Sequence, residues 1–288
     1  MFKNLYKKAE SKFAESILFL FALSAISALT LITVFIFVRG MPLIQEVGLW
    51  NFVSGTSWSP SHGEFGIAPM IAGSFAVMLG AAIIGIPIGI CCSIFLAEFA
   101  PEKVRNAFRP AIQLLAGIPS VVYGFWGMIF IVPFIRTFIG GPGFSVLAGS
   151  IVLGIMILPT IISIAEVSIL ALPRHYKDGA LALGLTHWQT IRYVLLPAAK
   201  SGIMAGVVLS IARAIGETMA ILMVLGNAVA IPASILDPVR TLTTNIGIEM
   251  GYAAGEHREA LFATGIVLFV IIMILNATAQ YITRRKRA

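Results

Sequence analysis

The stretch Ile211–Met219 carries an arginine and a glutamate in apolar surroundings, and these two side chains could act on an anion. If the stretch is helical, Arg213 and Glu217 lie one turn apart on one face. A guanidinium can hold a tetrahedral oxyanion with two parallel hydrogen bonds. A carboxylate beside it would neutralise the arginine in an empty site, and it would accept the proton that hydrogen phosphate keeps and sulfate lacks. The pattern therefore predicts an oxyanion pathway, with an ion pair that only orients the helix as the alternative.

Other polar residues carry weaker signals. Thr218 and Asn245 could donate hydrogen bonds to the same anion, although such residues more often serve helix packing or turns. Glu166 is expected to be an interfacial carboxylate rather than part of a proton relay. The four histidines lack metal-ligand spacing, and Cys91 and Cys92 are adjacent, which disfavours a disulfide between them.

A second stretch, from Leu172 to Pro197, has the local signals of two short helices. Pro173 suits the first position of a helix, and Gly184 suits a left-handed stop. Thr186 followed by Gln189 has the spacing of a capping box, which begins a second helix. Both helices would contribute to one apolar side, consisting of Ala180, Leu183, Trp188, Ile191 and Leu195. This side either docks on another protein or lies on the membrane surface.

The chain contains no G-x-x-x-x-G-K-[ST] segment, the loop that holds nucleotide phosphates in many ATPases. If ATP drives a process in which this chain takes part, another polypeptide must hydrolyse it. An intramembrane enzyme is also disfavoured, because no pair of nucleophile and base occurs at plausible positions within the apolar stretches. These absences favour a transport role over an enzymatic one.

The elements that must position these residues are membrane helices. Of the 288 residues, 58% are hydrophobic and 11% are charged, and the mean hydropathy is +0.95. This is far more apolar surface than one soluble core could bury. The net charge of +7 does not indicate nucleic-acid binding, because the basic residues cluster at the ends of apolar segments rather than along one polar face. An all-α, polytopic membrane protein is therefore expected.

Six stretches are long and apolar enough for a helix that crosses the bilayer. They are residues 16–38, 69–97, 111–135, 144–166, 201–229 and 260–283. With the N-terminus inside, all Lys and Arg residues lie on the cytoplasmic side except Arg213 within a span and the outer residues Arg39, Arg136, Arg240 and Arg258. This positive-inside bias predicts that both termini and the 172–197 loop are cytoplasmic.

The 172–197 loop resembles a motif of known transport proteins. Asp178-Gly179-Ala180, three residues, Gly184, nine residues, Val194, one residue and Leu196-Pro197 match the spacing of the EAA loop of ABC importer permeases. The sequence departs from this motif in having Asp-Gly-Ala for Glu-Ala-Ala and Val194 for isoleucine. The resemblance implies that a short helix of the loop inserts into a cleft of a separate ATPase subunit, with Gly184 allowing close approach.

Three segments resemble the PstC-type permeases of bacterial phosphate importers: Phe65–Gly73, Arg213–Met219 and Glu249–Arg258. The resemblance covers nearly the whole chain. It implies the type I ABC importer permease fold, a place in the bacterial inner membrane and transport of phosphate into the cytoplasm. It also implies a permease core at 69–283, preceded by a first helix and outer loop within 1–68 and followed by a basic tail at 284–288.

The same resemblance implies partners. A PstA-type permease would form a heterodimer with this chain, and the substrate would cross at their interface. Two copies of a nucleotide-binding subunit would hold ATP and magnesium, so this chain would need no cofactor of its own. A separate phosphate-binding protein would deliver the substrate outside. Closure of the ATPases would move the 172–197 loop, and the pathway beside Arg213 would change the side to which it opens.

Two alternatives remain open at this point. The chain could carry another oxyanion, such as sulfate, molybdate or phosphonate, because importers of these anions share the loop. It could also be an ion-coupled secondary transporter, which would need no ATPase. Such transporters often contain internal repeats, and the sequence shows no clear one.

Overall fold

The computed structural model describes residues 2–284, with side chains placed for residues 15–278 and 281. The N-terminal lysines and the predicted basic tail therefore lie outside the described side chains. The chain is almost entirely helical, which confirms the all-α prediction. Among the described residues, the sheet structure is limited to one short antiparallel hairpin of β1 (Trp58–Ser59) and β2 (Glu64–Phe65).

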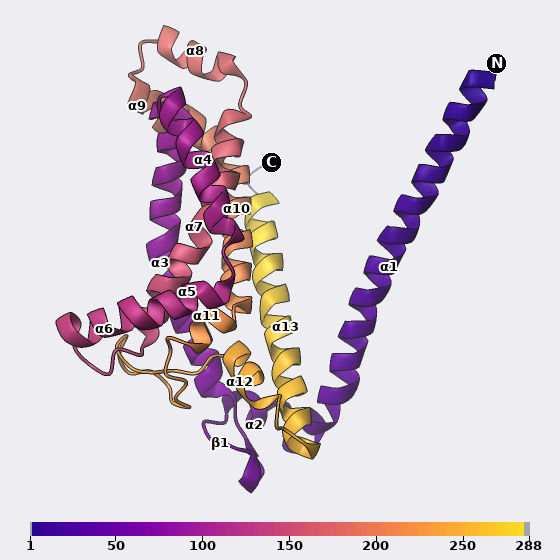
Figure 1. Ribbon diagram of the computed structural model, residues 1–288, viewed down its shortest axis with the longest axis vertical. Coiled ribbons are helices and arrows are strands. Elements are labelled where there is room, and N and C mark those ends of the chain that lie inside the picture. Colours follow the sequence, from indigo (N-terminus) through magenta and orange to yellow (C-terminus); the bar gives the residue numbers. More distant parts are fainter. Residues whose placement is uncertain (1, 285–288) are drawn as a thin grey trace.

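The helices, shown in Figure 1, vary from short turns to long rods. Their bounds are α1 Phe2–Val47, α2 Leu49–Ser54, α3 Ala68–Ile94, α4 Glu102–Gly117, α5 Ser120–Trp126, α6 Val132–Phe134, α7 Val146–Leu170, α8 Arg174–Ala182, α9 His187–Thr190, α10 Leu196–Gly216, α11 Met219–Leu222, α12 Leu242–Glu249 and α13 Gly255–Arg284. A 3₁₀ turn and four π-helical turns connect some of them: η1 Pro60–His62, η2 Phe95–Phe99, η3 Gly127–Ile131, η4 Ile135–Ile139 and η5 Ile191–Leu195.

Six helical runs of the described residues are long and apolar enough to cross a membrane, as predicted. They are Glu15–Val47, Ala68–Phe99, Ser120–Ile139, Val146–Leu170, His187–Gly216 and Gly255–Thr278. The start of α1, the end of α13 and the α8–α9 segment point toward one end of the molecule, whereas β1 and α12 lie at the other (Figure 1). The start of α1, the end of α13 and the α8–α9 segment thus point the same way, and the cytoplasmic placement of the termini and of the 172–197 loop stays a prediction.

The centre of the bundle is the contact between α3 and α7. A Cβ atom on Gly80 would overlap Ser150 Oγ, and one on Gly85 would lie 2.8 Å from the Ile157 side chain. Because real side chains do not tolerate such distances, these glycines allow the two helices to approach closely. α10 packs along another side of α7 and places Arg213 beside it.

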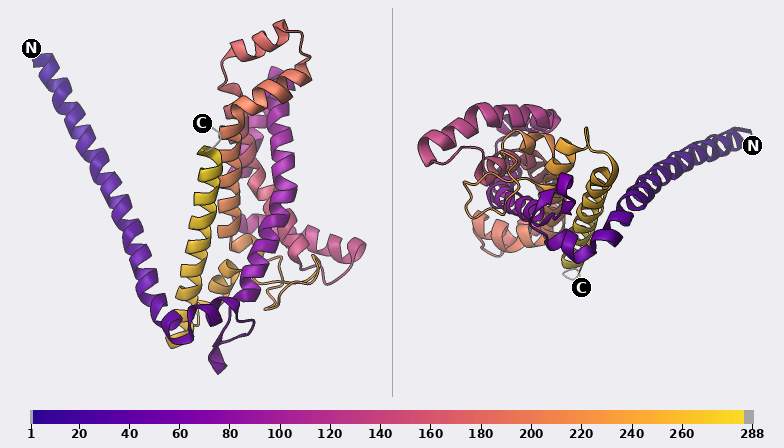
Figure 2. Two further views of the ribbon diagram at one scale, coloured as in Figure 1. Left: turned by 180° about the vertical axis from the view of Figure 1, so that it is seen from behind. Right: turned by 90° about the horizontal axis from the view of Figure 1, so that it is seen from below.

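The third predicted span, 111–135, is wrong as a single helix. α4 ends at Gly117, and Ile118 and Pro119 are extended, with ψ values of 128° and 140°. Proline has no N–H to continue the helix and disfavours the helical conformation of the residue before it, so the chain turns at this point. The run that is long and apolar enough to cross a membrane is Ser120–Ile139, and it leaves α4 at a steep angle and lies crosswise to α3 and α13 (Figures 1 and 2).

The fifth predicted span, 201–229, has the wrong ends. The helical run begins at His187, continues through η5 into α10 and ends at Gly216. Glu217 is extended, with a ψ of 136°, and its Oε1 accepts the N–H of Ala220 in the first turn of α11 at 3.1 Å. Glycine is a poor helix former, and the Glu217 carboxylate stabilises the start of a new helix instead of continuing the old one.

α1 stands apart from the bundle over most of its length. Near its C-terminal end it contacts α13, where a Cβ on Gly40 would come within 2.7 Å of the backbone of Phe262 and Ala263. From there α1 diverges from the other helices (Figures 1 and 2). None of the residues in its most apolar window is buried within this chain. Lipid or another polypeptide must therefore cover this helix.

The outer segments form a cap in which one buried carboxylate joins three elements. Glu249, at the end of α12, is 6% exposed, and its Oε2 accepts a hydrogen bond from Trp58 Nε1 at 2.9 Å. Arg240 Nη1 lies 2.6 Å from Oε1, and His257 Nε2 lies 2.8 Å from Oε2. The hairpin, the loop before α12 and the start of α13 are thus tied to one another.

We expect Glu249→Ala to destabilise the protein by about 3 kcal/mol, because the change leaves the half-buried guanidinium of Arg240 without its carboxylate. Thermal unfolding of the purified protein in detergent measures the effect. Glu256→Ala removes an exposed carboxylate from the first turn of α13 and is the matched control, with an expected change of about 0.5 kcal/mol or less. Equal stability of the two variants would contradict the role assigned to Glu249.

Candidate functional site

Arg213 lies in the last turn of α10, and its side chain is exposed on the surface of this chain. Its Nη1 lies 3.5 Å from Thr160 Oγ1 of α7. This is a long hydrogen bond, and it engages only one of the five N–H donors of the guanidinium. Arg213 can therefore offer further N–H groups to an anion that lies beside α7 and α10.

Glu217 does not pair with Arg213 among the ion pairs of the described residues. The helix ends between the two residues, so the prediction that they share one helical face is wrong. The Glu217 carboxylate caps α11, and its backbone oxygen accepts a hydrogen bond from Thr243 Oγ1 at 2.7 Å. Among the described residues Arg213 therefore lacks the neutralising partner that the sequence predicted.

Thr218 and Asn245 have other contacts. Thr218 Oγ1 lies 3.5 Å from the carbonyl oxygen of Gly216, at the end of α10. Asn245 is fully buried, and its Oδ1 accepts a hydrogen bond from Arg240 Nη1 at 3.0 Å. Asn245 therefore belongs to the outer cap, which agrees with its omission from the predicted pathway residues.

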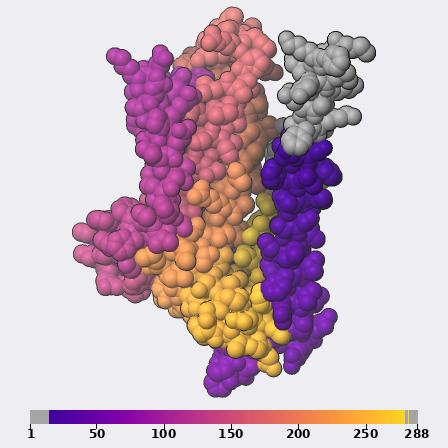
Figure 3. Space-filling model, turned by 45° about the vertical axis from the view of Figure 1, so that its right-hand side comes forward, coloured from indigo at the N-terminus to yellow at the C-terminus, as the bar shows by residue number. Residues whose placement is uncertain are grey.

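The exposed face of α7 continues from Thr160 toward the end of the molecule that carries α8 and α9. Ser163 and Val167 follow on this face at helical spacing, and both are exposed. They border a cavity of about 280 Å³, called here the α4–α7 cavity, which is lined by Arg109, Ile112, Gln113, Ser163, Glu166 and Val167. Figure 3 shows α4 as a ridge that stands out from the body of the molecule at this end.

Arg109 and Glu166 form an ion pair in the α4–α7 cavity. Arg109 Nη2 and Nε lie 2.8 and 2.9 Å from the same carboxylate oxygen, Oε1. The combination of arginine and carboxylate that was predicted for Arg213 and Glu217 therefore occurs between α4 and α7. Sequence reasoning missed this pair, because its members are 57 residues apart and Arg109 was counted only as a cytoplasmic cation. The available signal was the presence of Glu166 within an otherwise apolar span.

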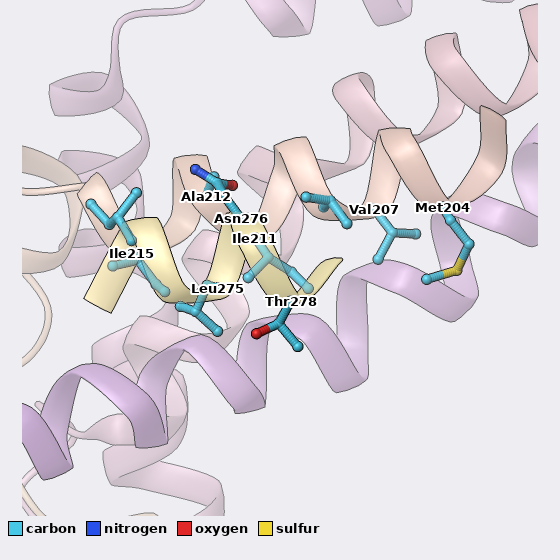
Figure 4. A pocket seen from close by; sticks show the side chains of 10 residues that line it. Met204, Val207, Ile211, Ala212, Ile215, Leu275, Asn276 and Thr278 are labelled. Carbon is cyan, nitrogen blue, oxygen red and sulfur yellow. The ribbon is translucent and has the colours of Figure 1, made fainter. Parts of the chain in front are cut away.

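A second hollow is apolar and lies on another side of α10. Its volume is about 210 Å³, and Figure 4 shows that α10 and α13 supply its walls. At about 100° per residue, Arg213 points away from the face of α10 that carries Ile211 and Ile215, which line this groove. The polar side chains in the lining are Asn276 and Thr278. Such a groove suits an acyl chain or another helix better than an oxyanion.

The local structure of the 172–197 loop follows its predicted signals closely. Gly184 has a φ of +85° and ends α8, as predicted. The capping box of Thr186 and Gln189 is present at the start of α9. Pro173 is the N-cap of α8, one residue before its predicted position.

The apolar side predicted for this loop divides into two groups. Ala180, Ile191 and Leu195 are buried within this chain, whereas Leu183 is 83% exposed and Trp188 is 55% exposed. Among the residues that match the EAA motif, Asp178, Gly179, Gly184 and Pro197 are exposed, and Val194 and Leu196 are half-buried. Val194, Leu196 and Pro197 lie in η5 and the first turn of α10, so the matched motif extends into the spanning helix.

Two contacts hold the 172–197 loop to the end of the second span. Glu98, in η2, accepts a hydrogen bond from Lys177 Nζ of α8 at 2.5 Å. His187 Nε2, at the start of α9, lies 3.2 Å from the same carboxylate oxygen. A displacement of α8 or α9 would therefore be transmitted through Glu98 to the end of the second span, as well as to α10.

Comparisons with known proteins agree with this architecture. A family model described as "Binding-protein-dependent transport system inner membrane component" matches residues 85–288. The "Probable ABC transporter permease protein YqgH" of Bacillus subtilis (strain 168) is 42% identical over 273 residues, which cover 92% of this chain and 88% of the relative. The "Phosphate transport system permease protein PstC" of Mesorhizobium japonicum is 35% identical, with 88% and 86% covered.

Solved structures show the same fold at low sequence identity. A chain of the inward-facing MetNI methionine ABC transporter has a TM-score of 0.61 at 19% identity, covering 80% of this chain and 99% of that chain. A chain of the bacterial alginate ABC transporter has a TM-score of 0.60 at 15% identity, covering 92% and 94%. These likenesses confirm the predicted type I ABC importer permease fold.

Proposed function

This chain belongs to the family of binding-protein-dependent transport system inner membrane components, and we propose that it is a permease subunit that conducts inorganic phosphate into the cytoplasm. The assignment of phosphate as the substrate rests on the similarity to permeases named PstC, which extends over more than four-fifths of the chain. Arg213 has the chemistry that this substrate requires, because it offers several N–H groups at the surface of two spanning helices.

The exposure of Arg213 supports a second permease subunit. An anion bound beside α7 and α10 would be open to lipid on its other side, and a charged group in hydrocarbon is costly. A PstA-type permease that packs against this face would close the pathway. The heterodimer interface would then contain Arg213, Thr160 and the exposed face of α7.

The 172–197 loop supports an ATPase partner. Leu183 and Trp188 are large and exposed, and the α8–α9 segment that carries them lies at one end of the molecule, so they offer an apolar contact for another protein. The chain has no phosphate loop of its own. We assign ATP and magnesium to two copies of a partner nucleotide-binding subunit, and delivery of phosphate to a binding protein on the opposite side.

The proposed coupling is mechanical. From His187 to Gly216 the chain forms one helical run of 30 residues, about 45 Å long along its axis at 1.5 Å per residue. The loop contact lies at one end of this run, and Arg213 lies at the other. Movement of α8 and α9 by the ATPases would tilt this helix against α7 and change the side to which the site beside Arg213 opens.

The test compares the uptake of radiolabelled phosphate by two kinds of cells. One expresses the complete importer, and the other expresses all of its subunits except this chain. We expect uptake to require the chain, because it supplies one wall of the pathway. Unlabelled phosphate should compete, whereas a tenfold excess of sulfate, molybdate or a phosphonate should not, since these anions differ in protonation or shape. Uptake of one of these other anions in preference to phosphate would assign the chain to a different oxyanion importer.

A further inference from the structure

We propose that the α4–α7 cavity is a second phosphate-binding station, which receives the anion from Arg213 and releases it toward the side of the 172–197 loop. In this station Arg109 binds the anion and Glu166 competes with it for the guanidinium. The inference rests on the proposed function, because it takes phosphate as the transported anion. It adds a site for which neither the family match nor the predicted motif residues provide a role.

The position of the cavity fits a step that follows Arg213. Thr160, which contacts Arg213, and Glu166 are six residues apart on α7, or about 9 Å along the helix axis. Glu166 is the nearer of the two to Leu170, where α7 ends at the 172–197 loop. Ser163 lies between them on the exposed face, so the polar groups of α7 lead from one arginine to the other.

The size and lining of the cavity suit a hydrated oxyanion. Its volume of about 280 Å³ corresponds to roughly nine water molecules at about 30 Å³ each. Arg109, Gln113 and Ser163 can all donate hydrogen bonds into this space, and Glu166 can accept one. The ion pair uses Arg109 Nε and Nη2, so Nη1 points to no atom of Glu166 and can donate to an anion.

The carboxylate explains how such a station could release its ligand. The Arg109 side chain is 41% exposed, so the cavity is partly open, but an arginine there without a carboxylate beside it would still hold a divalent anion and slow its release. Glu166 is 6% exposed and lies 2.8 Å from Arg109, so it neutralises the arginine whenever the cavity is empty. Hydrogen phosphate can still bind, because its hydroxyl can donate to the carboxylate. Sulfate at neutral pH has no such proton and would meet an uncompensated negative charge.

The alternative is that the pair only fastens α4 to α7. To separate the two roles, we compare the complete importer carrying Arg109→Met together with Glu166→Met with the wild-type importer. Glu166 is buried and Arg109 is 41% exposed, and methionine has an apolar side chain long enough to keep α4 packed on α7, so this double variant keeps the helix contact and removes the charges. Lys103→Met removes an exposed charge from the same helix and is the matched control.

We expect the double variant to take up phosphate at least about tenfold more slowly, the effect of one lost charge-assisted contact. Lys103→Met should take up phosphate at the wild-type rate. Uptake at the wild-type rate by the double variant would contradict the proposed second phosphate-binding site. Arg109 and Glu166 would then serve only to hold α4 against α7. A wild-type importer that carries no phosphate would instead overturn the proposed function, so the two failures are distinguishable.

A second measurement does not depend on the double variant being assembled. Glu166→Gln keeps an oxygen that can accept from Arg109 but removes the competing charge. The purified, nucleotide-free importer without its binding protein should then hold radiolabelled phosphate at least about threefold more tightly than wild type, while its uptake slows. Unchanged phosphate binding in Glu166→Gln would contradict the competition that we assign to this carboxylate.

Discussion

Arg213→Met is expected to lower phosphate uptake about a hundredfold or more, with the importer still assembled. A bidentate contact between a guanidinium and an oxyanion consists of two charge-assisted hydrogen bonds of about 1.5–3 kcal/mol each, and each 1.4 kcal/mol corresponds to a factor of about ten. Arg213 is exposed and makes one long hydrogen bond, to Thr160, so its removal leaves little unsatisfied within this chain. Uptake by membrane vesicles and co-purification of the subunits measure the two parts of this prediction.

Two variants sharpen this test. Arg213→Lys keeps the charge but loses the planar fork, so we expect an intermediate loss of uptake, about tenfold. Glu217→Gln keeps the oxygen that caps α11, and uptake should stay within about twofold of wild type, because Glu217 does not pair with Arg213. Normal uptake in Arg213→Met would exclude this residue from the pathway. If the Glu217→Gln variant no longer discriminated against sulfate, the Glu217 carboxylate would have to contact the substrate.

The contrast between Arg213 and Arg109 shows what a sequence can reveal about such a site. An arginine within an apolar span is costly, and this local feature makes Arg213 a candidate from the sequence alone. Its expected partner was wrong because the helix ends at Gly216, which periodicity alone did not indicate. Arg109 and Glu166 meet through the packing of α4 on α7, and no spacing rule connects residues so far apart. Local chemistry was therefore predictable, but long-range pairing was not.

The same distinction holds for the fold. The number of spans and the ends of α8 and α9 follow from hydrophobic length, from Gly184 and from the capping box, all of which act within a few residues. Pro119 is visible in the sequence, but it does not by itself indicate a break in the predicted third span, because many membrane helices accommodate proline. The close contact of α3 with α7 follows from glycines that the sequence displays, although it does not identify the partner helix.

Gly184→Phe is expected to prevent stable assembly with the ATPase and to lower uptake at least about tenfold. Gly184 ends α8 in the left-handed conformation, with a φ of +85°, and among the described residues, its two chain neighbours aside, no atom lies within 4 Å of where its Cβ would be. The first side-chain atom of a phenylalanine there would therefore point into open space. It would project from the loop beside the exposed Leu183, into the space that the proposed ATPase occupies. Co-purification of the ATPase and substrate-stimulated ATP hydrolysis measure the loss.

Backbone strain must be separated from this steric effect, because a side chain in the left-handed region costs about 1–2 kcal/mol by itself. Gly184→Asn is the control for strain, since asparagine tolerates this conformation, and it should keep most of the ATPase bound. Gly63→Phe is the control for position: Gly63 has a φ of +73° and equally open surroundings, but it lies in the hairpin at the opposite end of the molecule. If all three variants assemble like wild type, the 172–197 loop does not contact the ATPase at Gly184. Loss in Gly184→Phe alone would show that a partner surface lies directly against this glycine.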